Sequence, residues 1–205
     1  MEEVKLAIIY YSSTGTNYQL AKWAEEAGKN SEAAEVRFLR IRETAPEEAI
    51  QQNENWAKHV EATKDIPTVS LEDLEWADAF IFSAPTRYGN LPSQLTSFFD
   101  TTGGLWLKGK LVNKVVSGMT SSANTHGGQE STLLSLYKSM YHWGAIIVTP
   151  AYTSEVQFEA GGNPYGVSVS EGKDNLNDNI KEAVFHQAKR TLTLARWVKA
   201  GFSGG

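Results

Sequence analysis

The stretch that decides the fold is VKLAIIYYSSTGTNYQLA, residues 4–21. Its first part, Val4 to Tyr11, is β-branched, aromatic and nearly continuous in apolar residues, which is typical of a strand buried on both faces of a parallel sheet. From Asn17 onward the apolar residues recur with helical spacing, and Gly28 marks the expected end of that helix. Between strand and helix lies SSTGTN, residues 12–17, with hydroxyls, an amide and a glycine but no lysine or arginine. A strand, a polar loop and a helix in this order predict the first unit of an α/β fold.

The alternation of strand and helix patterns continues along the rest of the chain. Further strands are predicted over residues 34–41, 77–85, 110–119 and 145–150, and further helices over 46–62, 92–104, 129–144 and 176–199. Five strands that alternate with five helices predict a parallel, doubly wound sheet with helices on both faces, a three-layer α/β sandwich. The flavodoxin-like strand order 2-1-3-4-5 is one of the two common arrangements of such a sheet. Residues 152–175 are too many for a simple connection, so we expect a functional loop there.

Bulk properties narrow the classes of function. The chain has 205 residues, which fits a single domain over residues 1–205, and 41% of them are apolar against 21% charged. A net charge of −5 argues against electrostatic binding to nucleic acid. Without cysteine there is no disulfide, thiolate site or cysteine nucleophile, and no metal-spaced cluster of His, Asp and Glu stands out, so no metal is expected. The apolar run near the N-terminus is too short for a signal or membrane segment, and we expect a cytoplasmic protein without membrane insertion.

The loop over residues 12–17 is the strongest candidate for a ligand site. In an open parallel sheet, ligands bind beyond the carboxyl ends of the strands, and this loop follows the first strand. Its backbone amides and the next helix N-terminus form an anion site, to which Ser12, Thr14 and Thr16 add hydroxyl donors. The motifs GxxxxGK[ST] and GxGxxG are both absent from this loop, so the predicted ligand is a terminal phosphate monoester. The alternative is a plain helix N-cap, for which one such residue suffices.

Two further loops are expected at the same edge of the sheet. APTRYGNLP, residues 84–92, follows the third predicted strand, and MTSSANTHGGQE, residues 119–130, follows the fourth. The first offers polar and aromatic side chains around a glycine turn, and the second offers small polar groups for the edge of a heterocycle. Each loop alone is also compatible with an ordinary surface turn. Together with a phosphate site, they suit a flat heteroaromatic monophosphate such as FMN.

The chain resembles the flavodoxin-like WrbA family (tryptophan repressor-binding protein A) of NAD(P)H:quinone oxidoreductases. The matching stretches are IIYYSSTGT, DAFIFSAPTRYGN, FFDTTGGLW, GGQE, HWGAIIV and GGNPYG, which run from the first strand to beyond the fifth. PTRYGN followed by TGGLW is fairly specific to this family within the flavodoxin-like group. The resemblance implies the strand order 2-1-3-4-5, non-covalently bound FMN, transfer of two electrons from NAD(P)H to quinones, and a homotetramer.

The resemblance also implies the residues of the site. Cofactor-binding positions are expected in the three loops: Ser12, Ser13, Thr14, Gly15, Thr16 and Asn17 at the phosphate, Pro85, Thr86, Arg87, Tyr88, Gly89 and Asn90 beside the isoalloxazine ring, and Thr120, Ser121, Ser122, Asn124, His126 and Gly127 after the fourth strand. Trp106 is expected to line the substrate pocket, and His142 to reach the flavin from a helix of this or another subunit. Thr14 departs from the family, whose members often carry an aromatic residue there to help hold the nicotinamide nucleotide.

The expected catalytic residues are Arg87, Trp106 and His142. Arg87 and His142 are candidates to stabilise the negative charge of reduced flavin, since His142 ends a helix whose dipole favours a cation. Trp106 and Tyr88 could stack on planar rings. The alternatives are a plain helix C-cap for His142 and ordinary packing for the two aromatic residues.

A flavodoxin-type electron carrier is the competing function. Carriers are usually shorter, more acidic and monomeric, whereas this chain contains TGGLW and GGNPYG, which suit a pocket or a subunit interface. A regulatory DNA-binding role has no support, because the sequence shows neither a basic stripe nor a reading helix.

Overall fold

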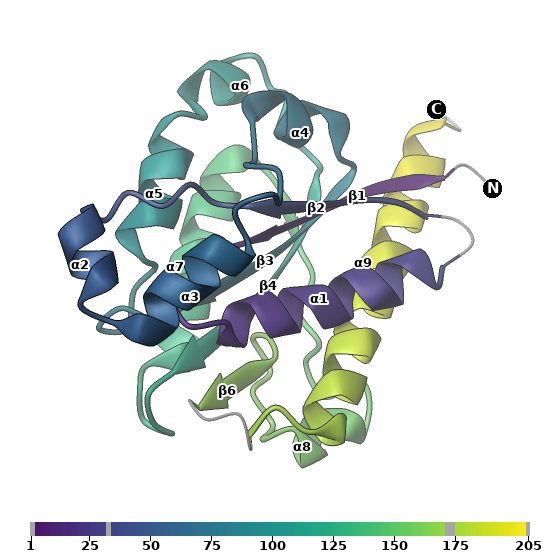
Figure 1. Ribbon diagram of the computed structural model, residues 1–205. Helices are drawn as coiled ribbons and strands as arrows, with labels where there is room; N and C mark the ends of the chain where they lie inside the picture. Colours follow the sequence, from purple (N-terminus) through teal and green to yellow (C-terminus); the bar gives the residue numbers. More distant parts are fainter. Residues whose placement is uncertain (1–2, 32–33, 171–174, 204–205) are drawn as a thin grey trace.

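The computed structural model describes residues 3–31, 34–170 and 175–203 (Figure 1). The elements follow in chain order: β1 Val4–Tyr10, α1 Thr16–Lys29, β2 Ala34–Arg40, α2 Glu47–Gln51, α3 Glu54–Ala62, α4 Leu71–Trp76, β3 Ala79–Pro85, α5 Ser93–Asp100, α6 Gly103–Leu107, β4 Val115–Ser122, α7 Gln129–Trp143, β5 Ile146–Ile147, α8 Val156–Glu159, β6 Ser168–Ser170 and α9 Asp178–Ser203. Within the described residues, no helix is both long enough and apolar enough to cross a membrane.

The sheet has the predicted strand order. Its parallel strands run β2-β1-β3-β4-β5, and β6 adds a further parallel pairing with β4. One row of paired residues crosses the whole sheet: Val36, Leu6, Ala79, Val115 and Ile146. Because all strands point the same way, the loops after β1, β2, β3 and β4 meet at one edge, here called the carboxyl edge.

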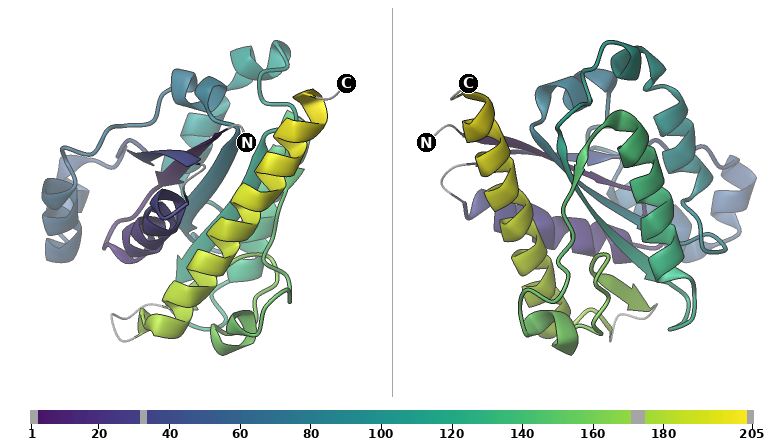
Figure 2. Two further views of the ribbon diagram at one scale, coloured as in Figure 1. Left: turned by 90° about the vertical axis from the view of Figure 1, so that its right-hand side faces the viewer. Right: turned by 180° about the vertical axis from the view of Figure 1, so that it is seen from behind.

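Helices cover both faces of the sheet (Figures 1 and 2). On one face α1 and α9 bury an apolar core with β1 and β3, in which Leu20 and Val184 are fully buried. On the other face α5 and α7 pack on Phe80, Phe82 and neighbouring residues. All seven residues of β3 are buried, as expected for a central strand covered on both sides. Each fully buried large apolar side chain contributes about 1.5–3 kcal/mol to the stability of this layered arrangement.

Two predicted helices are interrupted. The helix predicted over 46–62 is divided into α2 and α3, because Asn53 leaves the helical conformation (φ −123°) and its side chain accepts hydrogen bonds from the N–H groups of Asn55 and Trp56. The helix predicted over 92–104 ends at Asp100, and the two glycines expected to stop it instead begin α6. The short helix α4 was not predicted, although its capping box between Ser70 and Asp73 is readable as S-x-x-D in the sequence.

The strands next to the site also differ from the prediction. β4 spans residues 115–122 instead of 110–119, so part of the predicted fourth loop belongs to the strand. β5 contains only Ile146 and Ile147, which pair with Val115 and Val116 at the N-terminal end of β4, and the chain then leaves the sheet. β6 comes from the segment expected to be a loop, and it pairs with Thr120 to Ser122 at the C-terminal end of β4. The same edge of β4 is therefore covered by two strands from different parts of the chain.

Candidate active site

The loop after β1 forms a tight turn that leads into α1. Ser12 Oγ accepts a hydrogen bond of 3.0 Å from the Gly15 N–H, and Gly15 caps the helix at φ +102°. Non-glycine residues rarely adopt this backbone conformation, so the turn depends on the glycine. Within the described residues, the N–H groups of Thr16, Asn17 and Tyr18 donate to no protein group. They are free to bind an anion at the positive end of the α1 dipole.

A cation reaches this loop from the neighbouring loop. Arg87 follows β3, and its Nη2 donates to Ser13 Oγ at 2.9 Å, while its Nη1 donates to the Thr86 carbonyl at 3.0 Å. The family resemblance put Arg87 beside the flavin ring, and the structure adds that its guanidinium reaches the phosphate loop. The site therefore combines helix N–H donors with one full positive charge, although the loop itself contains no basic residue.

Asn17 anchors the loop to the sheet. Its side chain is buried, with Nδ2 donating to Ser121 Oγ at 2.6 Å and Oδ1 accepting from Ser83 Oγ at 3.2 Å. The Ser83 hydroxyl also lies 2.9 Å from the Asn17 carbonyl oxygen. The amide thus ties α1 to β3 and β4, so a phosphate would meet the Asn17 backbone N–H and not its side chain.

The loop after β3 presents an exposed aromatic ring. Arg87 and Asn90 close the turn through two backbone hydrogen bonds of 2.8 and 3.0 Å. Tyr88 sits in this turn at φ +53° and its side chain is fully exposed, at 102% of the reference area. A positive φ is uncommon for a large side chain and marks a backbone held by its surroundings. Gly89, at φ +77°, donates its N–H to Thr86 Oγ1 at 3.1 Å and completes the turn.

The loops after β3 and β4 are clamped together at the start of α7. Thr132 Oγ1 lies 2.7 Å from Thr86 Oγ1, and Ser131 Oγ donates to the Gly89 carbonyl at 2.7 Å. A Cβ on Gly128 would lie only 2.8 Å from the Gly89 Cα, so the two backbones touch where both residues are glycine. This contact holds the two loops at a defined separation.

A cavity of about 380 Å³ opens between these two loops at the carboxyl edge. It is lined by residues from both: Pro85, Thr86, Arg87, Tyr88, Ser121, Ser122, Ala123, Asn124 and Gly127. Its volume lies within the range of small-molecule sites, and Arg87 connects it to the phosphate loop. A planar ring in the cavity with a phosphate on the α1 N-terminus fits this donor set, so the described residues are compatible with FMN.

Some predicted residues of the fourth loop lie outside this cavity. Thr120 is fully buried within β4, and its Oγ1 donates to the Ala84 carbonyl at 2.7 Å. His126 is exposed and does not line the cavity, and its N–H donates to Asn124 Oδ1 at 2.9 Å. Because β4 ends at Ser122, three residues later than predicted, Thr120 belongs to the strand and not to the loop that follows it.

Trp106 and His142 lie at the opposite edge of the sheet. Trp106 Nε1 donates to the His142 carbonyl at 2.7 Å, and the Gly144 carbonyl just beyond accepts from the Asn113 N–H before β4 begins. The seven residues of β3 separate the two edges by about 20 Å, at about 3.3 Å per residue. Neither side chain can therefore reach the cavity of its own chain. Tyr141 of α7 is also exposed here.

Sequence reasoning missed two ionisable residues behind the phosphate loop. Glu43 follows β2, and the rule that ligands gather at the carboxyl edge, applied to the second strand as to the others, would have found it. His59 comes from α3, and its Nδ1 lies 3.7 Å from where a Cβ on Gly15 would sit. Burial lowers the pKa of His59, which favours the neutral ring. No local sequence signal marks His59, because only the packing of α3 brings it to the loop.

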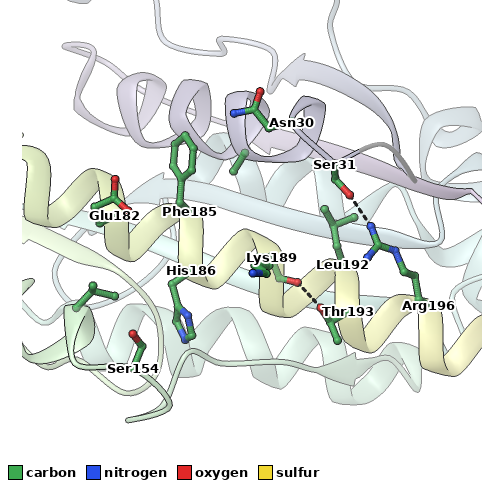
Figure 3. Close-up of a pocket in the computed structure, with 12 residues that line it drawn as sticks. Asn30, Ser31, Ser154, Glu182, Phe185, His186, Lys189, Leu192, Thr193 and Arg196 are labelled. Carbon is green, nitrogen blue, oxygen red and sulfur yellow. Dashed lines mark hydrogen bonds between the residues drawn. The ribbon is translucent and has the colours of Figure 1, made fainter.

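A larger cavity, of about 580 Å³, lies on the α1–α9 face of the molecule (Figure 3). Figure 3 shows Phe185 and Leu192 of α9 pointing toward α1, while His186 points the other way, toward Ser154. No residue predicted for the site lines this cavity. Volume alone therefore does not locate the site, and the convergent donors at the carboxyl edge make the smaller cavity the candidate.

The chain is similar to known proteins over most of its length. Residues 4–159 match the family model described as NADPH-dependent FMN reductase. The chain is 51% identical over 191 residues to an NAD(P)H dehydrogenase (quinone) of Deinococcus radiodurans, covering 93% of this chain and 95% of that protein. It is 40% identical over 176 residues to an NAD(P)H dehydrogenase (quinone) of Aromatoleum aromaticum, covering 83% and 84% of the two chains.

Solved structures support the fold. A flavodoxin described as a WrbA-like protein from Agrobacterium tumefaciens aligns with a TM-score of 0.64 at 19% identity, covering 95% of this chain and 99% of that one. An NADH:FMN oxidoreductase in its apo form aligns with a TM-score of 0.61 at 13% identity, covering 93% and 89%. At these identities the likeness concerns the arrangement of the backbone.

Proposed function

Because the chain belongs to the NADPH-dependent FMN reductase family, we propose that it is an FMN-dependent NAD(P)H:quinone oxidoreductase. The observation that carries this proposal is the continuity of the phosphate loop with the cavity between the loops after β3 and β4, joined by Arg87. The resemblance to the WrbA family read from the sequence agrees with the curated relatives that are named NAD(P)H dehydrogenase (quinone).

Two groups of residues hold the cofactor in this proposal. The free N–H groups of Thr16, Asn17 and Tyr18 would hold the phosphate, and the guanidinium of Arg87 would lie beside it. The ring system lies in the cavity, where Tyr88 supplies an exposed aromatic face. FMN, when bound, supplies the site that accepts a hydride from NAD(P)H and passes two electrons to a quinone.

The protein's own contribution is binding, orientation and electrostatics. Arg87 and the α1 dipole favour negative charge at the cofactor. The cavity is open to solvent on the side of the exposed Tyr88, so NAD(P)H and quinone can occupy it in turn. Thr14 is exposed at the rim of the phosphate loop, where it offers the nicotinamide nucleotide a hydroxyl and not an aromatic face.

Direct reduction by NAD(P)H tests this function against that of a flavodoxin-type electron carrier. The FMN-loaded protein is mixed anaerobically with NADH or with NADPH in a stopped-flow instrument, and the flavin absorbance is followed. An oxidoreductase loses the oxidised-flavin absorbance rapidly and completely, and regains it on addition of a quinone. Absence of direct reduction by either nucleotide would favour the carrier and refute the proposal.

We also propose that the working form is a homotetramer in which Trp106 and His142 serve the site of another copy. Both residues are exposed at the edge of the sheet opposite the carboxyl edge, too far from the cavity of their own chain to act there. Exposed apolar side chains accompany them, including Leu107, Val112 and Tyr141. A patch of this kind favours association between chains.

Substitution of Trp106 tests this arrangement. Trp106→Ala should lower quinone turnover while FMN remains bound, because the residue contacts substrate only across the interface. The mass of the wild-type protein by light scattering should correspond to four chains. A monomeric protein with full activity, or unchanged quinone kinetics in Trp106→Ala, would contradict the shared site.

The remaining assignments are the extent of the domain and the location. We propose that residues 1–205 form a single domain, since the two apolar cores flank one sheet. We propose a cytoplasmic location, where NAD(P)H is available.

A further inference from the structure

Glu43 lies in the segment that follows β2, behind the phosphate loop. Its carboxylate accepts hydrogen bonds from five donors at 2.8–3.1 Å: the N–H groups of Thr44 and Ala45, Gln94 Nε2, Tyr11 Oη and Trp56 Nε1. These donors come from β1's end, α3, α5 and the segment itself. A half-buried carboxylate with this many donors is a fixed acceptor and not a freely moving surface group.

The charge state of this centre is well defined. Burial opposes the ionised form of Glu43, but the hydrogen bonds from Ala45, Gln94, Tyr11 and Thr44 outweigh it and hold the pKa of Glu43 below its ordinary value. Burial, chiefly, raises the pKa of Tyr11, so its hydroxyl stays protonated. Around neutral pH the pair is therefore a carboxylate acceptor and a hydroxyl donor.

A chain of hydrogen bonds leads from Glu43 to the cation of the site. Tyr11 Oη donates to Glu43 Oε2 at 3.0 Å, Ser13 Oγ donates to Tyr11 Oη at 3.4 Å, and Arg87 Nη2 donates to Ser13 Oγ at 2.9 Å. The carboxylate has no proton to give, so the Tyr11 hydrogen must point toward it. Tyr11 then accepts from Ser13, and Ser13 presents its lone pairs to Arg87.

We propose that Glu43 is a positioning residue for the phosphate of FMN, which acts through Tyr11 and Ser13 to hold Arg87 at the phosphate loop. This inference rests on the proposed function, because it needs the loop over residues 12–17 to be the phosphate site. Glu43 itself does not touch the cofactor.

Two substitutions should disturb the chain in different ways. In Glu43→Gln an amide NH₂ replaces one acceptor, so the Tyr11 hydrogen turns toward Ser13 and the Ser13 hydrogen toward Arg87, where two donors oppose each other. Tyr11→Phe removes only one hydroxyl and leaves Glu43 with four of its donors, so it should fold even if Glu43→Gln does not. Glu48→Gln is the matched control, since Glu48 is exposed in the same region of the chain.

The experiment compares FMN with riboflavin, which has the same ring and ribityl chain but no phosphate, by flavin fluorescence titration. Glu43→Gln and Tyr11→Phe should raise the Kd for FMN about five- to thirty-fold, the effect of weakening one charge-assisted hydrogen bond, and leave the Kd for riboflavin within about two-fold. Glu48→Gln should change neither. In an Arg87→Ala background, Tyr11→Phe should add less than about two-fold, because the residue through which it acts is gone.

The outcomes separate the two proposals. If the wild-type protein binds riboflavin as tightly as FMN, the phosphate assignment in the proposed function fails. If the wild type prefers FMN but the two variants weaken both flavins equally, or weaken neither, the role of Glu43 is refuted while the phosphate site stands. A full effect of Tyr11→Phe in the Arg87→Ala background would also refute it.

Discussion

Replacement of Gly15 by alanine is a direct test of the phosphate loop. Gly15 has φ +102° and ψ −14°, and the nearest atom to an added Cβ is His59 Nδ1 at 3.7 Å, an ordinary contact. The substitution is therefore opposed by backbone strain and not by a steric clash. A non-glycine residue in the left-handed region costs about 1–2 kcal/mol. This strain opposes the turn that presents the N–H groups at the start of α1, so Gly15→Ala should raise the Kd for FMN by about five- to thirty-fold.

Gly109→Ala is the matched control. Gly109 also has a positive φ, +66°, and an added Cβ would meet no atom within 4 Å, but the residue lies in the turn after α6, away from the carboxyl edge. It carries a similar strain that no ligand depends on. Gly109→Ala should therefore lower the melting temperature by about 2–8 °C, at about 2–4 °C per kcal/mol for a chain of this size, without changing the affinity for FMN.

Titration of FMN into the apo forms, followed by flavin fluorescence, measures the difference, and calorimetry gives the melting temperatures. Gly15→Val should bind still less FMN, because a β-branched side chain adds crowding to the strain. Wild-type affinity in Gly15→Ala would refute the reasoning, as would an equal loss of affinity in Gly109→Ala.

Two further predictions concern stability. Gly166→Ala should lower the free energy of unfolding in urea by more than about 3 kcal/mol, because an added Cβ would lie 2.1 Å from the Gly118 carbonyl oxygen of β4. Gly104→Ala is the control and should change this free energy by less than about 1 kcal/mol, because no atom lies within 4 Å of its added Cβ. A mild effect of Gly166→Ala would show that β6 can move away from β4. Burial lowers the pKa of His59 below about 6.5, so below that pH the unfolded chain binds a proton that the folded chain does not, and stability should fall as pH drops, by at most about 1.4 kcal/mol per pH unit for this residue. Urea midpoints at pH 7.5 and 5.5 should show a smaller drop for His59→Gln than for the wild type; parallel drops would remove His59 as the cause.

The comparisons agree with the fold and the family that the sequence indicates, and the reason is that both depend on local patterns. The apolar runs of β1 and β3 and the helical period of α1 and α9 are properties of neighbouring residues. Their alternation leaves two common strand orders, and the family resemblance selected the one observed. Local patterns did not predict that the helix over residues 46–62 is divided at Asn53, or that both β5 and β6 pair with the same edge of β4. The first depends on one side chain capping a new helix, and the second on which segment finally pairs with Thr120 to Ser122.

By itself, the sequence determined the α/β sandwich and the three loops at the carboxyl edge, because hydrophobic period and glycine position are properties of neighbouring residues. The resemblance of its motifs to a known family selected the strand order. Only the tertiary structure decided that Arg87 contacts Ser13 and that Glu43 accepts a hydrogen bond from Tyr11. It also decided that Trp106 and His142 lie at the edge of the sheet opposite the carboxyl edge. Those relations join residues 32 to 74 positions apart, and no local sequence pattern records which distant residues come into contact. The packing of helices on the sheet sets these distances, and with them the chemistry of the site.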